Sequence, residues 1–336
     1  MDLMQGLFAD LQGQPLAQQL LEAALEQRRL APAYLFSGPD GVGRRLAAHR
    51  FLEGLLSGGG SDARERRRLE DRNHPDLLWV EPTYSHQGRL IPRSEAEAAG
   101  VSRRTPPQVR LEQIRALSRF LARQPLESSR GLVILEQPEA MAEGAANALL
   151  KTLEEPGHGL LILLSAAPER LLTTIRSRCQ QIRFTRLSES CMGAVLDSLP
   201  NQEGQQALAL ASGQPELMAL AAGSPGALLE HVRIWTSIPD DLKQRLQTIP
   251  PSPVEAMALA RDLSDQLDGE QQLWLIGWWQ QHLWRAYERQ ALLIRLDRLR
   301  QHLLSFVQPR LAWEVALLNL SELRTRPSAQ ALARLS

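Results

Sequence analysis

The first half of the chain alternates short apolar runs with amphipathic segments, which predicts strands interleaved with helices. Each run is only a few residues long, and between the runs apolar residues recur every three or four positions. Strands that are apolar throughout are typical of a parallel sheet covered by helices on both faces. We expect strands at 34–36, 77–80, 132–135, 160–164 and 181–184, and therefore predict an α/β fold with a five-stranded parallel sheet.

The segments between these strands divide into helices and polar stretches. Helices are expected at 14–30, 44–56, 109–123 and 142–155. The polar segments 57–73 and 83–107 contain glycine or proline, so we expect both to be surface loops. In the first of them the basic cluster 64–68 is interleaved with acidic residues, which indicates a solvated helix face more than a grip on DNA.

The strand signal disappears after Leu187, and the rest of the chain has a helical pattern. Helices are expected at 189–199, 203–211, 215–222 and in a series from 225 to the end. Glycine and proline breaks lead us to predict three domains, an α/β domain at 1–184, a small helical domain at 185–228 and an all-helical domain at 229–336. In the last domain, Trp274, Trp278, Trp279 and Trp284 fall on several faces of one helix, which predicts a buried helix instead of a membrane-surface one.

Composition narrows the class of protein. The 38 basic and 38 acidic residues cancel, so no overall basic field draws the chain to nucleic acid. Lys151 and Lys243 are the only lysines, which indicates a general preference for arginine. Cys179 and Cys191 are too few for a disulfide framework, a four-thiolate zinc site or an iron–sulfur cluster. With neither a signal-peptide pattern nor an apolar run of membrane-spanning length, we expect a soluble cytoplasmic protein without a membrane partner.

The loop after the first strand resembles a phosphate-binding loop with altered chemistry. It reads Gly38-Pro39-Asp40-Gly41-Val42-Gly43-Arg44-Arg45. Gly38 and Gly43 occupy the glycine positions of a P-loop, but Arg44 stands at the lysine position and Arg45 at the Ser/Thr position. Arg45 has no oxygen to offer Mg²⁺ and brings a second cation to the place of the metal. The alternative is an ordinary tight turn between a strand and a helix.

A second nucleotide-binding element is altered as well. The apolar strand at 132–135 is followed by Glu136-Gln137, where an ATPase would have one carboxylate to organise Mg²⁺ and a second to activate water. Glu136 supplies the first, but the amide of Gln137 cannot accept a proton. Taken alone, without the other motifs, the two residues favour a polar strand end.

Four motifs in a fixed order make the chain similar to a known family. They are 33–43 (AYLFSGPDGVG), 74–76 (HPD), 145–156 (AANALLKTLEEP) and 177–179 (SRC). The same order occurs in bacterial clamp-loader subunits, which are AAA+ proteins of the DNA polymerase III holoenzyme. The resemblance covers residues 1 to about 230, and its most specific part is the third motif followed by Ser-Arg-Cys. Taken by itself, the His-Pro-Asp motif favours a structural turn over acid–base chemistry.

The resemblance implies an AAA+ α/β domain, a helical lid and a helical collar that holds a ring of subunits together. Within the family, the altered loop and the Glu136-Gln137 pair resemble the subunit that does not hydrolyse ATP, and not the ATP-hydrolysing gamma/tau type. Arg178 of the Ser-Arg-Cys motif is then an arginine finger for ATP on a neighbouring subunit, with Arg176 as the substitute candidate. Ser165 stands at the position of a γ-phosphate sensor. The implied partners are gamma/tau and delta subunits and, through the complex, the sliding clamp and primed template DNA, with no cofactor of the chain's own.

The chain departs from the family in places, and two other functions stay open. Relatives often have a four-cysteine zinc module within 57–73, which is absent here, so no zinc is expected. Gly226 stands where ATPase relatives have a sensing arginine. The alternatives are an active clamp-loader ATPase that tolerates Arg44 and uses Glu136 alone, and a AAA+ motor of DNA repair or recombination.

Overall fold

The computed structural model describes residues 6–96, 98–101, 106–155, 157–305 and 307–325. They form two compact units, which are described separately. The first contains the described residues up to 204 together with 223–227, and the second contains 205–222 and the described residues from 228 onward. The three-domain division expected from the sequence stays a prediction.

The first unit is built on the predicted parallel sheet of five strands, in the order β2-β5-β6-β1-β7. The strands are β1 (Ala33–Ser37), β2 (Leu77–Val80), β5 (Leu132–Glu136), β6 (Leu160–Ser165) and β7 (Gln180–Arg183). Each lies within two residues of its expected position. The α/β prediction is therefore confirmed.

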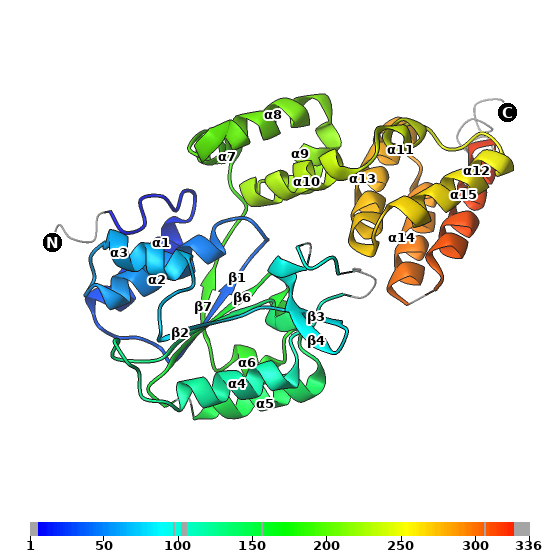
Figure 1. Cartoon of the computed structure of the whole chain (residues 1–336). Helices are drawn as coiled ribbons and strands as arrows, with labels where there is room; N and C mark the ends of the chain where they lie inside the picture. The colour runs from blue at the N-terminus through cyan, green and yellow to red at the C-terminus, as the bar shows by residue number, and fades with distance from the viewer. Residues whose placement is uncertain (1–5, 97, 102–105, 156, 306, 326–336) are drawn as a thin grey trace. The chain divides into compact units, whose positions relative to one another are not determined.

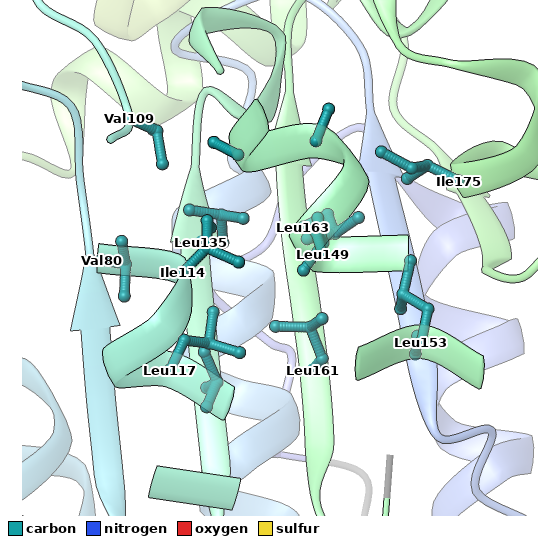
Figure 2. Packing of buried hydrophobic residues seen from close by; sticks show 14 of the residues in the cluster. Val80, Val109, Ile114, Leu117, Leu135, Leu149, Leu153, Leu161, Leu163 and Ile175 are labelled. Atoms are coloured by element: carbon teal, nitrogen blue, oxygen red, sulfur yellow. The ribbon is translucent and has the colours of Figure 1, made fainter. Parts of the chain in front are cut away.

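Helices cover both faces of this sheet (Figure 1). They are α1 (Pro15–Glu26), α2 (Arg44–Leu56), α3 (Ala63–Glu70), α4 (Leu111–Leu121), α5 (Glu143–Glu154) and the short α6 (Thr173–Arg176). Figure 2 shows Ile114 and Leu117 of α4 and Leu149 and Leu153 of α5 packed against the strands. On β1, Leu35 belongs to this cluster. Successive side chains of a strand alternate between faces, and the neighbouring Tyr34 instead meets Phe51 of α2, with ring centroids 5.1 Å apart.

The two segments expected to be surface loops contain regular structure, so both loop predictions are wrong in part. Segment 57–73 forms α3, whose first turn is capped by Asp62. The fully buried carboxylate of Glu53 accepts hydrogen bonds from Ser61 Oγ (2.7 Å), Asp62 N (2.9 Å) and Arg66 Nε (2.9 Å). A buried carboxylate needs such partners, and Glu53 thereby fixes the start of a helix that has few apolar residues of its own.

Segment 83–107 contains an antiparallel hairpin, β3 (Thr83–His86) with β4 (Arg89–Pro92). Gln87 and Gly88 both have positive φ (49° and 76°), which suits the tight turn between twisted strands. Tyr84 is buried with Ala96 and Val101, so the hairpin has a small core of its own. Residues 97 and 102–105 of the expected loop lie outside the described part of the chain.

The His-Pro-Asp motif has the structural role that was predicted for it. Asp76 precedes β2, and its carboxylate accepts hydrogen bonds from the amides of Leu126 (2.7 Å), Glu127 (2.8 Å) and Ser128 (2.7 Å). Burial alone would raise the pKa of Asp76, but these backbone hydrogen bonds lower it to about 2. The motif therefore anchors the loop that leads into β5.

The rest of the described chain is helical, as expected. The first unit ends with α7 (Glu189–Asp197) and the beginning of α8 (Glu203–Gly213), and it includes the start of α10 (Pro225–Ser237). The second unit adds α9 (Pro215–Ala221), α11 (Asp240–Arg245), α12 (Pro253–Gln266), α13 (Gly269–Tyr287), α14 (Gln290–Leu304) and α15 (Pro309–Thr325). Among the described residues, no helix combines the length and apolar character that a membrane crossing requires.

The tryptophan-rich helix α13 is buried on several sides, which confirms the prediction from its sequence. Trp278 and Trp279 are fully buried, and Trp279 Nε1 donates a hydrogen bond to the Leu246 carbonyl (2.9 Å). Trp313 of α15 is also fully buried and donates to Gln272 Oε1 of α13 (3.0 Å). Trp284 remains exposed. These aromatics are core residues of the second unit.

Candidate functional site

The glycine-rich loop joins β1 to α2, as a phosphate-binding loop would. Gly38, Gly41 and Gly43 all have positive φ, and Gly43 directly precedes the helix. A Cβ at Gly38 would lie 2.3 Å from the Phe184 carbonyl oxygen, so a side chain is sterically excluded there. Pro39 and Asp40 complete the turn, and Val42 is buried. The loop thus has the strand–turn–helix setting and the glycine backbone that a phosphate-binding loop requires.

The loop is covered by the segment 223–227, which belongs to the same unit. Gly226 N donates a hydrogen bond to the Gly41 carbonyl (3.1 Å), and Ser224 Oγ donates to the Asp40 carbonyl. A Cβ at Gly226 would lie 2.7 Å from Gly41 Cα. Position 226, where the family resemblance implied the loss of a sensing arginine, is a contact between two backbones with no room for a side chain.

Arg44, at the lysine position, is turned back onto its own loop. It is buried and forms an ion pair with Asp40. Burial lowers the pKa of the Arg44 guanidinium, while Asp40, Glu139 and Glu136 oppose this. Its Nη1 is buried and has no hydrogen-bond partner among the described residues.

Arg45, at the Ser/Thr position, is paired with the strand-end carboxylate. Its Nη2 lies 2.7 Å from Oε1 and 2.8 Å from Oε2 of Glu136, the last residue of β5. The guanidinium therefore neutralises the carboxylate that would organise Mg²⁺. Gln137 follows in a left-handed conformation (φ 47°) and offers an amide in place of a second carboxylate. These side chains do not fit a Mg²⁺ site, because a cation already contacts the carboxylate that would hold the metal.

The structure also places two aromatic side chains beside Arg45 that the sequence analysis did not single out. The guanidinium carbons of Arg45 and Arg72 lie 5.7 Å and 4.5 Å from the ring centroid of Trp79. The ring of His49 lies 5.1 Å from the same indole. Burial, and then the charges of Arg45, Arg50 and Arg72, lower the pKa of His49 to about 4. Arg44 and Arg45 at the start of α2 are thus paired with Asp40 and Glu136, so these carboxylates are already engaged by cations.

Ser165 and Glu139 lie near the carboxyl ends of the strands, as the loop does. Ser165 ends β6 beside Ser37 of β1, is fully buried, and accepts a hydrogen bond at its carbonyl from Gly38 N (3.2 Å). Its Oγ is buried and unpartnered within the described chain. Glu139, which sequence reasoning missed, accepts hydrogen bonds from the amides of Ala166 (2.9 Å) and Ala167 (3.2 Å). An acidic residue in the turn after the Glu136-Gln137 pair was the available signal.

Arg178 lies at the amino ends of the parallel strands, opposite the carboxyl ends where the loop lies. It lies between α6 and β7. Strand β7 begins beside Tyr34, near the start of β1, whereas the loop follows the end of β1. At about 3.3 Å per residue, the four residues from Tyr34 to Gly38 alone separate the two by roughly 13 Å. Arg178 therefore does not serve its own loop.

The Arg178 side chain is exposed and held by two contacts. Nη1 donates to the Thr174 carbonyl (3.0 Å) and Nη2 to Glu154 Oε1 at the end of α5 (2.8 Å). Glu154 was not recognised as a partner, although it lies in the most specific motif. Arg176, the substitute candidate, is less exposed than Arg178, and its Nε is buried. Burial raises the pKa of the adjacent Cys179 to about 12, so this thiol stays protonated.

No metal centre accompanies these elements in the part of the chain that the structure describes. No group of three or more His, Cys, Asp or Glu side chains there is arranged to hold a metal ion. Where relatives have a zinc module, Glu53 and Arg66 link α2 and α3 instead. The expectation that the chain binds no zinc stays a prediction.

Comparisons with known proteins agree with this architecture. The family model described as "DNA polymerase III, delta subunit" matches residues 13–188, and the one described as "Cyanobacterial DNA polymerase III delta prime, C-terminal domain" matches residues 190–320. A DNA polymerase III subunit delta' from Pseudomonas aeruginosa is 32% identical over 231 residues, which are 66% of this chain and 64% of that protein. A subunit delta' from Bacillus subtilis is 35% identical over 196 residues, or 56% of this chain and 52% of that protein. The chain thus matches less than two thirds of the length of either relative.

A solved structure supports the fold. The crystal structure of a DNA polymerase III gamma subunit-related protein from Thermotoga maritima matches with a TM-score of 0.51 and 17% identity, covering 90% of this chain and 98% of that one. Together with the two family models, the order of the strands and the loop after β1, these comparisons assign the chain. It belongs to the DNA polymerase III delta prime family of AAA+ clamp-loader proteins.

Proposed function

We propose that the chain is the delta prime subunit of a replicative clamp loader, a largely non-hydrolysing subunit that lends Arg178 to ATP on a neighbouring subunit. It works in the cytoplasm in a ring with gamma/tau and delta subunits, and the ring loads the sliding clamp onto primed template DNA. It requires no cofactor of its own, neither Mg²⁺-ATP at its loop nor zinc.

The contact between Arg45 and Glu136 carries this proposal. Hydrolysis needs a carboxylate to organise Mg²⁺ and a base to activate water. Glu136 is bound by Arg45, Gln137 cannot take a proton, and the segment 223–227 packs on the loop backbone. The alternative of an active ATPase would need Glu136 free of Arg45. A AAA+ motor of DNA repair or recombination would also need a Glu136 carboxylate free of Arg45, and no other feature of the described residues favours that alternative.

The position of Arg178 supports the second half of the proposal. A guanidinium stays charged at any physiological pH and can bind two phosphate oxygens at once, so it suits the charge that develops on a transferring γ-phosphoryl group. Arg178 is exposed, and it lies at the sheet edge away from its own loop. Its charge is therefore available to a neighbouring molecule.

The test is ATP hydrolysis by a complex reconstituted from this chain with gamma/tau and delta subunits. Arg178→Ala should leave assembly on gel filtration intact and lower turnover at the site that receives the finger by roughly 10³- to 10⁵-fold. Arg170→Ala removes the same charge from an exposed residue eight positions earlier in the chain and should leave the rate unchanged. An unchanged rate with Arg178→Ala would remove the finger from the account, and a loss with Arg176→Ala instead would assign it to that residue.

A further inference from the structure

Two contacts from different elements hold the Arg178 guanidinium. The Thr174 carbonyl of α6 accepts from Nη1 and the Glu154 carboxylate at the end of α5 accepts from Nη2, at 3.0 Å and 2.8 Å. Arginine carries more N–H donors than these two bonds use. A guanidinium held in this way keeps donors available for a further anion.

We infer that Glu154 is a positioning residue for Arg178, an inference that rests on the proposed function. The carboxylate fixes the far end of a long, flexible side chain before the neighbouring subunit arrives. A side chain that is already ordered loses less conformational freedom when it binds the γ-phosphate, so more of its interaction energy reaches the transition state.

The exposure of the pair indicates that its role is not to stabilise the fold. The side chain of Arg178 is 36% exposed and that of Glu154 is 54% exposed. Exposed ion pairs contribute little to stability because water screens them and both side chains lose freedom. Water also screens the attraction that would otherwise keep Arg178 from a phosphate, which brings several negatively charged oxygens.

A competing role for Glu154 predicts the opposite result. If the carboxylate mainly competed with phosphate for the guanidinium, its removal would free Arg178 and speed up hydrolysis. If it positions Arg178, its removal slows hydrolysis. The direction of the change therefore separates the two roles.

The experiment measures steady-state ATP hydrolysis by the reconstituted complex with variants of this chain. We expect Glu154→Ala to lower kcat by about 3- to 10-fold at an unchanged KM for ATP, because positioning acts on the transition state. Glu154→Gln should retain most of the rate, since its amide oxygen can still accept from Nη2. Glu155→Ala is the matched control, because it removes the same charge from the adjacent exposed residue, and it should have no effect.

A double-mutant cycle with Arg178→Ala completes the test. Glu154→Ala should have no further effect when Arg178 is already absent, because positioning needs a side chain to position. An unchanged or faster rate for Glu154→Ala, or an equal loss in the Arg178→Ala background, would overturn the inference. If Arg178→Ala itself leaves the rate unchanged, the proposed function fails, and that outcome is distinct from a failure of Glu154 alone.

Discussion

Two arginine–glutamate pairs in the same α/β unit have nearly the same N–O distance and carboxylates in different surroundings. Arg45 lies 2.7 Å from Glu136, and Arg178 lies 2.8 Å from Glu154. Glu136 ends a central strand and is only 14% exposed, whereas Glu154 ends a helix and is 54% exposed. The first pair is built into the sheet edge that would bind nucleotide, and the second lies on the surface.

The difference shows that the carboxylate's surroundings decide what the arginine can do. Glu136 is mostly buried although Arg45 is 59% exposed, and we propose that the guanidinium there takes the place of a metal ion. Water screens the Glu154 carboxylate, so this carboxylate orients the Arg178 guanidinium but leaves it able to bind another anion. We propose that the first pair keeps this chain from holding Mg²⁺ at its own loop and that the second serves a neighbouring site.

The largest effect is expected from disturbing the packing of the segment 223–227 on the glycine-rich loop beside the Arg45–Glu136 pair. Gly41 has φ 75°, and a Cβ there would lie 2.4 Å from Ala227 N. Gly41→Ala should therefore lower the free energy of unfolding by about 2–4 kcal/mol, from left-handed strain together with the clash. Urea denaturation measures this loss.

Gly58→Ala is the control for Gly41→Ala. Gly58 has a similar φ of 69° but nothing within 4 Å of an added Cβ, so only the backbone strain of about 1 kcal/mol is expected. Equal losses for the two variants would mean that the segment 223–227 does not close on the loop.

A Glu→Gln substitution in each pair compares the two carboxylates directly, with a smaller expected change in the free energy of unfolding. Glu136→Gln should lower the free energy of unfolding by about 1 kcal/mol, because it weakens a charged contact at a mostly buried strand end. Glu154→Gln should change it by no more than about 0.5 kcal/mol, as for other exposed pairs. Chemical denaturation of the two variants compares them directly, and a larger loss at Glu154 would reverse the assignment of which pair is structural.

Much of the α/β unit could be predicted because its signals are local. The apolar runs at β1, β2, β5 and β6 are short and uninterrupted, so their positions follow from the sequence. The hairpin β3–β4 was missed because its apolar residues are few and lie within a long polar segment. Helix α3 was indicated only as a solvated helix face at 64–68 within an expected loop, because its start is fixed by the buried Glu53 of another helix and not by an apolar stripe of its own.

The site was only partly predictable because its decisive contacts join residues far apart in the chain. The altered chemistry at Arg45 and Glu136 was visible from their motifs, but their contact across 91 positions was not. The role of Gly226 also appears only when its backbone meets Gly41. Glu154 and Arg178 each lie in a recognised motif, yet no spacing rule pairs a helix end with a turn 24 positions later.

The central proposal is that Arg45 and Gln137 leave this chain unable to split ATP. The decisive measurement is phosphate release from ATP by the purified chain alone, with and without Mg²⁺, in the absence of any other clamp-loader subunit. We predict a rate no higher than that of a protein-free control under either condition. Sustained Mg²⁺-dependent turnover that co-elutes with the isolated chain would contradict the account.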